Sequence, residues 1–126
     1  MANSLLSIKP HVVSRDLTGY SVLLYGEPKS GKTTTASKFP NSLLLAFELG
    51  YNALPGVMAK PMATWRDMRT TLKELDDPEV KAVFKNIIID TVDLAYDAAK
   101  KYVCNQNEVN DITDIGFGEL LPPYWI

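Results

Sequence analysis

The sequence predicts a layered α/β domain in which helices flank a parallel β-sheet. Two observations carry this prediction: three short apolar runs occur, and segments with helical spacing separate them. The runs are residues 21–25, 42–47 and 86–90. Near-continuous apolar runs are typical of parallel strands that are covered on both faces, and parallel strands need long crossover connections.

Helical segments are expected at residues 32–39, 65–75, 78–84 and 91–104. Thr64 and Asp67 resemble a capping box, and Trp65 begins an apolar stripe that continues through Met68, Leu72 and Leu75. The Asp77-Pro78 pair is typical of an N-cap followed by a first-turn proline. The last segment has apolar residues at helical spacing, which include Val92, Ala95, Tyr96 and Ala99, and this face is expected to lie on the sheet.

The length and the composition indicate one soluble domain. The chain has 126 residues and a formal net charge of −2, so no large positive field attracts nucleic acid or anionic lipid. Cys104 is the single cysteine, which favours a reducing compartment, and no apolar stretch is long enough to span a bilayer. We expect a cytoplasmic protein with one domain over residues 1–126, an N-terminal extension at 1–19, and a loop and unassigned tail at 105–126.

A glycine-rich segment follows the first predicted strand and carries the strongest functional signal. It matches the pattern Gly-x-x-x-x-Gly-Lys-Thr, in which glycines allow backbone amides to wrap phosphates, the lysine contacts the β- and γ-phosphates, and the threonine hydroxyl binds magnesium. We therefore predict binding of ATP with Mg²⁺. The predicted nucleotide-binding residues are Gly26, Glu27, Pro28, Lys29, Ser30, Gly31, Lys32, Thr33 and Thr34.

Asp90 ends the third apolar run and is the predicted second magnesium residue, together with Thr33. A buried strand that delivers a carboxylate beside a phosphate-binding loop is the usual arrangement for holding this cation. The simpler alternative is that Asp90 only caps the following helix.

Glu48 and Lys32 are the predicted catalytic residues. Glu48 ends the second apolar run, and the carboxyl ends of parallel strands meet where ligands bind. A carboxylate there is able to activate water, while Lys32 stabilises charge on the phosphates. Glu27 and Asp93 are weaker candidates for the base, and the position directly after the strand aspartate is occupied by Thr91.

The ordered motifs resemble the RecA-like P-loop NTPases, and within them small phage-encoded ATP-binding proteins of single-strand DNA recombination. The resemblance covers residues 20–105. It implies a Mg²⁺-dependent ATPase in phage or bacterial DNA recombination or repair. Relatives continue beyond the Asp90 helix into further strands, one of which lies between the phosphate-loop strand and the Asp90 strand. This chain therefore corresponds to an incomplete or minimal version of the core, whose uncovered edges predict self-association or a protein partner. Its basic residues are dispersed, which argues against single-stranded DNA binding.

Two other functions stay open at this point. The first is a nucleotide-binding interaction module that does not hydrolyse, which is consistent with the missing strand. The second is a small P-loop kinase, which usually needs an arginine-rich lid, whereas only Arg66 and Arg69 lie between the motifs. No Asn/Thr-Lys-x-Asp motif is present to select guanine.

Overall fold

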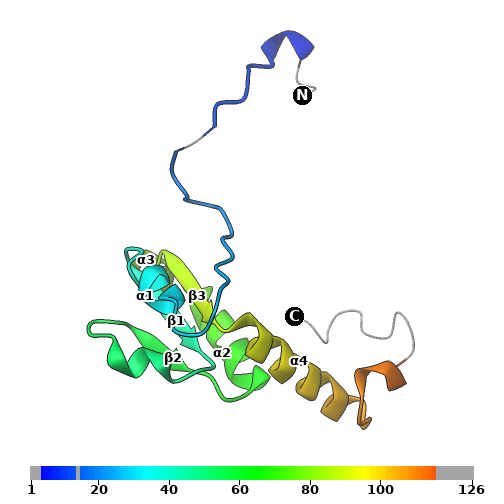
Figure 1. Ribbon diagram of the computed structural model, residues 1–126. Helices are drawn as coiled ribbons and strands as arrows, with labels where there is room; N and C mark the ends of the chain where they lie inside the picture. Colours follow the sequence, from blue (N-terminus) through cyan, green and yellow to red (C-terminus); the bar gives the residue numbers. More distant parts are fainter. Residues whose placement is uncertain (1–3, 14, 116–126) are drawn as a thin grey trace.

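Three parallel strands form the sheet, and helices lie on both of its faces (Figure 1). The computed structural model describes residues 4–13 and 15–115. The strands lie in the order β2 (Ala59–Pro61), β1 (Ser42–Ala46) and β3 (Asn86–Asp90). Leu44 is paired with Ala59 on one side and with Ile88 on the other. The predicted mixed α/β class with a parallel sheet is therefore confirmed.

The helices agree closely with the segments expected from the sequence. They are α1 (Lys32–Ser37), α2 (Trp65–Leu75), α3 (Pro78–Val83) and α4 (Val92–Gln106), with three 3₁₀ turns at Leu5–Ser7 (η1), Gly50–Ala53 (η2) and Ile112–Asp114 (η3). The predicted capping box is present, since Thr64 accepts from the Asp67 backbone N–H and Asp67 accepts from the Thr64 backbone N–H. Asp77 caps α3 through the Glu79 N–H, with Pro78 in the first turn.

The two faces of the sheet are covered by different helices. Leu45 packs with Met62 and with Met68 of α2, and this cluster is the main buried core. Leu44 lines a cavity with Ser37 of α1. Because successive strand residues point to opposite faces, α1 and α2 lie on opposite sides of the sheet. Trp65, the first residue of the apolar stripe of α2, packs against the Leu45 cluster.

The prediction of a strand at residues 21–25 was wrong. This segment has no strand assignment, and its apolar side chains are exposed, from Leu24 at 41% to Tyr25 at 88%. A strand exists only where its backbone groups pair with a neighbour, and among the described residues the sheet consists of β2, β1 and β3, none of which pairs with this segment. The segment instead continues the extended N-terminal arm that Figure 1 shows reaching away from the sheet.

Three predicted core positions are also corrected. Leu72, Val92 and Tyr96 are all exposed by more than 40%. On α2 the buried positions are Met68 and Thr71, so the inner face is rotated away from Leu72. On α4 the buried positions are Ala95, Ala99 and Val103, which leaves Val92 and Tyr96 without cover at the helix start.

Some ends of the predicted elements differ from the observed ends by one or two residues. Strand β1 ends at Ala46 and not at residue 47, and α1 ends at Ser37. Helix α4 runs to Gln106, so the predicted loop starts later than residue 105, and the unassigned tail lies outside the described residues. None of the helices in residues 4–13 and 15–115 combines the length and the apolar character needed to cross a membrane.

Candidate functional site

The glycine-rich segment forms a tight loop that leads directly into α1. Gly31 is the N-cap of α1 and has φ of 92°, a left-handed conformation that a side chain would strain. Lys29 also has positive φ, at 60°, and the Ser30 N–H donates to the Glu27 carbonyl over 3.3 Å. The first-turn amides of a helix have no partner within the helix, so those of Lys32 and Thr33 are available to a ligand.

The Lys32 side chain folds back over this loop. Its Nζ donates to the Gly26 and Glu27 carbonyl oxygens, each over 2.8 Å. The Ser30 Oγ lies 3.5 Å from the same ammonium group. The positive charge is therefore held at the centre of the loop, where phosphate oxygens are expected.

Thr33 and Asp90 meet although 57 residues separate them. The Thr33 Oγ1 donates to the Asp90 Oδ2 over 2.8 Å, and both residues are partly buried. A hydroxyl and a carboxylate that converge at the end of a loop and a strand are oxygen ligands of the type that Mg²⁺ prefers. The residues present fit this cation, which would complete its shell with phosphate oxygens and water.

The structure brings the Glu48 backbone next to Asp90. The Asp90 carbonyl accepts from the Phe47 N–H over 2.7 Å and from the Glu48 N–H over 3.3 Å. Both residues thus lie at the carboxyl edge of the sheet, as the order of the motifs predicts. The Glu48 residue is exposed, so its carboxylate is open to solvent on this edge.

The other carboxylates near the site differ in their surroundings. Asp93 is in the first turn of α4, and the Thr91 hydroxyl, followed by the Leu94 backbone N–H, lowers the pKa of its carboxyl group. A lowered pKa makes Asp93 a weaker base than an ordinary carboxylate.

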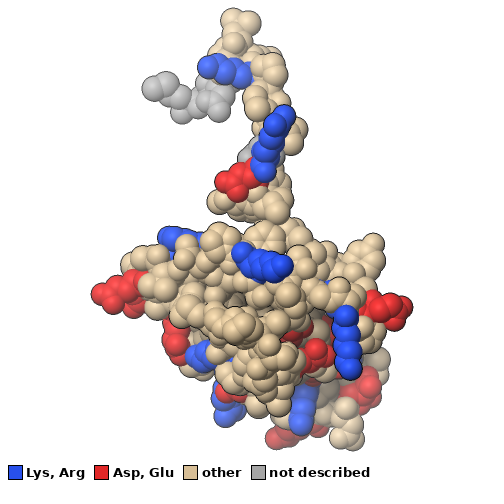
Figure 2. Space-filling view, turned by 60° about the vertical axis from the view of Figure 1, so that its left-hand side comes forward, with Lys and Arg blue, Asp and Glu red and all other residues tan. Residues whose placement is uncertain are grey.

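On the face that Figure 2 shows, basic and acidic side chains are intermixed over the body of the protein.

A recess of about 320 Å³, lined in part by Phe47, was not anticipated from the sequence. It lies between the carboxyl ends of β1 and β2 and the first half of α4. Its lining is mostly apolar, with one acidic and one basic side chain: Phe47, Met62, Ala63, Leu94, Asp97, Ala98 and Lys101. No local signal in the sequence indicated this recess, because its lining comes from three separate segments of the chain.

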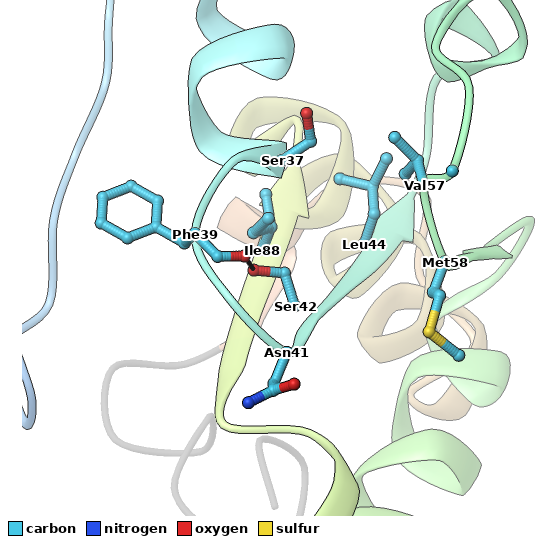
Figure 3. A pocket seen from close by; sticks show the side chains of 9 residues that line it. Ser37, Phe39, Asn41, Ser42, Leu44, Val57, Met58 and Ile88 are labelled. Carbon is cyan, nitrogen blue, oxygen red and sulfur yellow. Dashed lines mark hydrogen bonds between the residues drawn. The ribbon is translucent and has the colours of Figure 1, made fainter.

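A second cavity, of about 130 Å³, lies away from the predicted nucleotide site. Figure 3 shows Leu44, Val57 and Ile88 around it, with Ser37 from α1. It includes Asn41 and Ser42 at the amino end of β1, whereas Thr33, Glu48 and Asp90 lie at the carboxyl ends of the strands. This cavity is therefore separate from the phosphate-binding loop.

Comparisons with known proteins place the chain within one family. Residues 18–121 match the family model described as "AAA domain". A curated relative from Bacillus subtilis (strain 168), the SPbeta prophage-derived uncharacterized protein YorG, is 34% identical over 122 residues. The match covers 94% of this chain and 38% of the relative, so the chain spans less than two fifths of the relative's length. No solved structure matches the chain.

Proposed function

This chain belongs to the AAA domain family, and we propose that it binds ATP with Mg²⁺ and hydrolyses the γ-phosphate. The family is of the nucleotide-binding P-loop type, which supports the first part of this proposal. The observation that carries it is the Thr33 to Asp90 contact, which joins the phosphate-binding loop to the carboxyl end of β3. Phosphate-binding loops work together with such a carboxylate when they bind a nucleotide through a metal ion.

Each residue of the loop region has a distinct role in this proposal. The backbone amides from Glu27 to Thr34 enclose the phosphates, and the Lys32 ammonium exchanges its two carbonyl partners for phosphate oxygens. The Thr33 hydroxyl and Asp90 hold Mg²⁺, directly or through water. Magnesium, when bound, neutralises the charge that develops on the phosphates.

Glu48 is the proposed general base for the attacking water. Its backbone lies within hydrogen-bond distance of the Asp90 carbonyl, and its side chain is open to solvent on the same edge. Water bound beyond the γ-phosphate would be within reach of a carboxylate at this position. Asp93 is the weaker candidate because its pKa is lowered.

The process that uses the ATPase is proposed to be phage or bacterial DNA recombination of RecA-like type. The prophage origin of the relative and the order of the three motifs support this proposal. The intermixed charges in Figure 2 favour a protein partner over direct binding of single-stranded DNA. Stimulation by DNA is therefore a separate outcome to be measured.

The test compares magnesium-dependent ATP binding with phosphate release for the wild type, Lys32→Ala and Glu48→Gln. Wild type is expected to bind and to hydrolyse. Lys32→Ala is expected to lose binding, because it removes the positive charge inside the loop. Glu48→Gln is expected to bind normally and to release phosphate at least about 100-fold more slowly, as general acid–base groups contribute factors of this size.

Matched variants control for the loss of charge. Lys38→Ala removes an exposed lysine that follows α1 and lies outside the loop, and Glu79→Gln makes the same change as Glu48→Gln at an exposed site of α3. Both are expected to behave as wild type. Binding without turnover by the wild type would replace the ATPase by a non-hydrolysing interaction module, and transfer of phosphate to a small acceptor would indicate a kinase. No magnesium-dependent binding would refute the proposed site.

A further inference from the structure

Three cationic side chains occupy one face of α2. Arg66, Arg69 and Lys73 have the spacing of a single row along a helix, which is about 10 Å long. We call them the basic row. Arg69 fixes the position of this row, because its guanidinium donates to the Tyr102 hydroxyl of α4 and lies over the Tyr102 ring, 5.4 Å from the ring centre. The basic row therefore runs along α2 beside α4.

Within the described residues, no carboxylate forms an ion pair with the basic row. The carboxylates of α2, of its C-cap and of the middle of α4 have other partners, which are Lys60 for Glu74, Lys81 for Asp76, Lys100 for Asp97 and the α2 capping box for Asp67. Like charges three and four residues apart on a helix repel each other. The charge of the basic row is thus uncompensated in this fold, and an anion supplied by a partner would compensate it.

One end of the basic row lies near the apolar recess. Ala63, which lines the recess, comes three residues before Arg66. Lys101 also lines the recess and is the neighbour of Tyr102 on α4. The row and the recess together are complementary to a ligand that carries negative charges and one bulky apolar group.

We propose that this surface binds a short acidic segment of a partner protein. The segment lies extended along α2, with carboxylates on the basic row and one large apolar side chain in the recess. Alternate side chains of an extended segment are about 7 Å apart, which is close to the spacing of neighbouring cations in the row. The guanidinium fork of arginine matches a carboxylate, and Tyr102 holds that of Arg69 in place.

The charges around the basic row favour a short acidic segment over nucleic acid. The whole chain has a formal net charge of −2, so no long-range positive field attracts a polyanion. The row is also bounded by carboxylates, since Asp76 is the C-cap of α2 and Asp97 lines the recess. A continuous phosphate backbone that extended beyond the row would approach these like charges.

Nitrogen-15 NMR titration with two synthetic peptides, Asp-Ser-Asp-Ser-Asp-Ser-Phe and its reverse sequence, tests the proposal for either direction of the segment. At least one peptide is expected to bind with a Kd of about 10 µM to 1 mM and to shift the amides of residues 66–73 and 94–102. Asparagine in place of every aspartate is expected to weaken binding at least about tenfold. Serine in place of phenylalanine is expected to weaken it at least about threefold.

Protein variants locate the binding surface. The double variant Arg66→Gln with Lys73→Gln is expected to bind at least about fivefold more weakly, while its urea midpoint stays at or above that of wild type because like charges are removed. Lys38→Gln removes an exposed lysine that follows α1 and is expected to bind as wild type. Lys32→Ala is also expected to bind the peptide as wild type, which separates this proposal from nucleotide binding.

Three results would overturn the proposal. The first is the absence of binding by both peptides at up to about 5 mM. The second is equal binding by the asparagine peptide or by the double variant. The third is an oligothymidylate of about twelve nucleotides that shifts the same amides at lower concentration than the peptides, which would assign the basic row to nucleic acid.

Discussion

Replacing Thr33 by valine tests whether the phosphate-binding loop and β3 are joined as the structure shows. The substitution keeps the side-chain shape and removes the hydroxyl that donates to Asp90 over 2.8 Å. A hydrogen bond to a charged group contributes about 1.5–3 kcal/mol. Both residues are only partly buried, so water replaces part of this contribution, and we expect the free energy of unfolding to fall by about 1–1.5 kcal/mol.

Urea unfolding followed by far-ultraviolet circular dichroism measures this change. With an m-value of about 1–3 kcal/mol per molar urea, the midpoint should fall by about 0.3–1.5 M. Thr34→Val is the matched control, because Thr34 is the next residue of α1 and is exposed. In an Asp90→Ala background, Thr33→Val should cost no more than the control, which gives a coupling energy of about 1 kcal/mol. Additive effects of the two substitutions would refute the contact.

Three further predictions concern stability and the loop. Asp67→Asn should destabilise the protein at neutral pH, because the Thr64 backbone N–H and, second, the Thr64 hydroxyl hold the pKa of Asp67 below its ordinary value of 3.8. This stabilisation is present above pH 3.8 and is lost as the pH falls through the lowered pKa. Equal stability of the variant and the wild type at pH 7 would contradict the prediction. Leu45→Ala should lower the free energy of unfolding by about 2–5 kcal/mol in urea titrations, since Leu45 is fully buried in the main core cluster; a loss below about 1 kcal/mol would contradict this packing. Gly31→Ala should reduce ATP affinity measured by calorimetry, because φ of 92° is strained for alanine; unchanged affinity would show that the loop binds no phosphate.

Local signals in the sequence predicted most of the fold. The apolar runs at 42–47 and 86–90 became β1 and β3, and the Thr64 and Asp67 pair began α2 as a capping box. These signals work because hydrophobic periodicity and capping act within a few residues. The strand predicted at residues 21–25 failed because strand formation is not a local property. The segment has the apolar composition of a strand, but its backbone groups also need a neighbouring strand to pair with.

The part of the candidate site that lies at the carboxyl ends of the strands could be predicted from the sequence. Thr33, Glu48 and Asp90 were expected at one edge, and the structure brings Thr33 into contact with the Asp90 side chain and the Glu48 backbone next to the Asp90 carbonyl. Strand β2 was missed because it has three residues, one of them proline. Without β2 there was no means of predicting the recess beside Phe47 and Met62, which combines three segments distant in the sequence.

Asp90 connects the phosphate-binding loop with the segment that carries Glu48. Its side chain accepts a hydrogen bond from the Thr33 hydroxyl, and its carbonyl accepts from the backbone N–H groups of Phe47 and Glu48. A change in the position of β3 would therefore move the proposed magnesium residue and the segment of the proposed general base together.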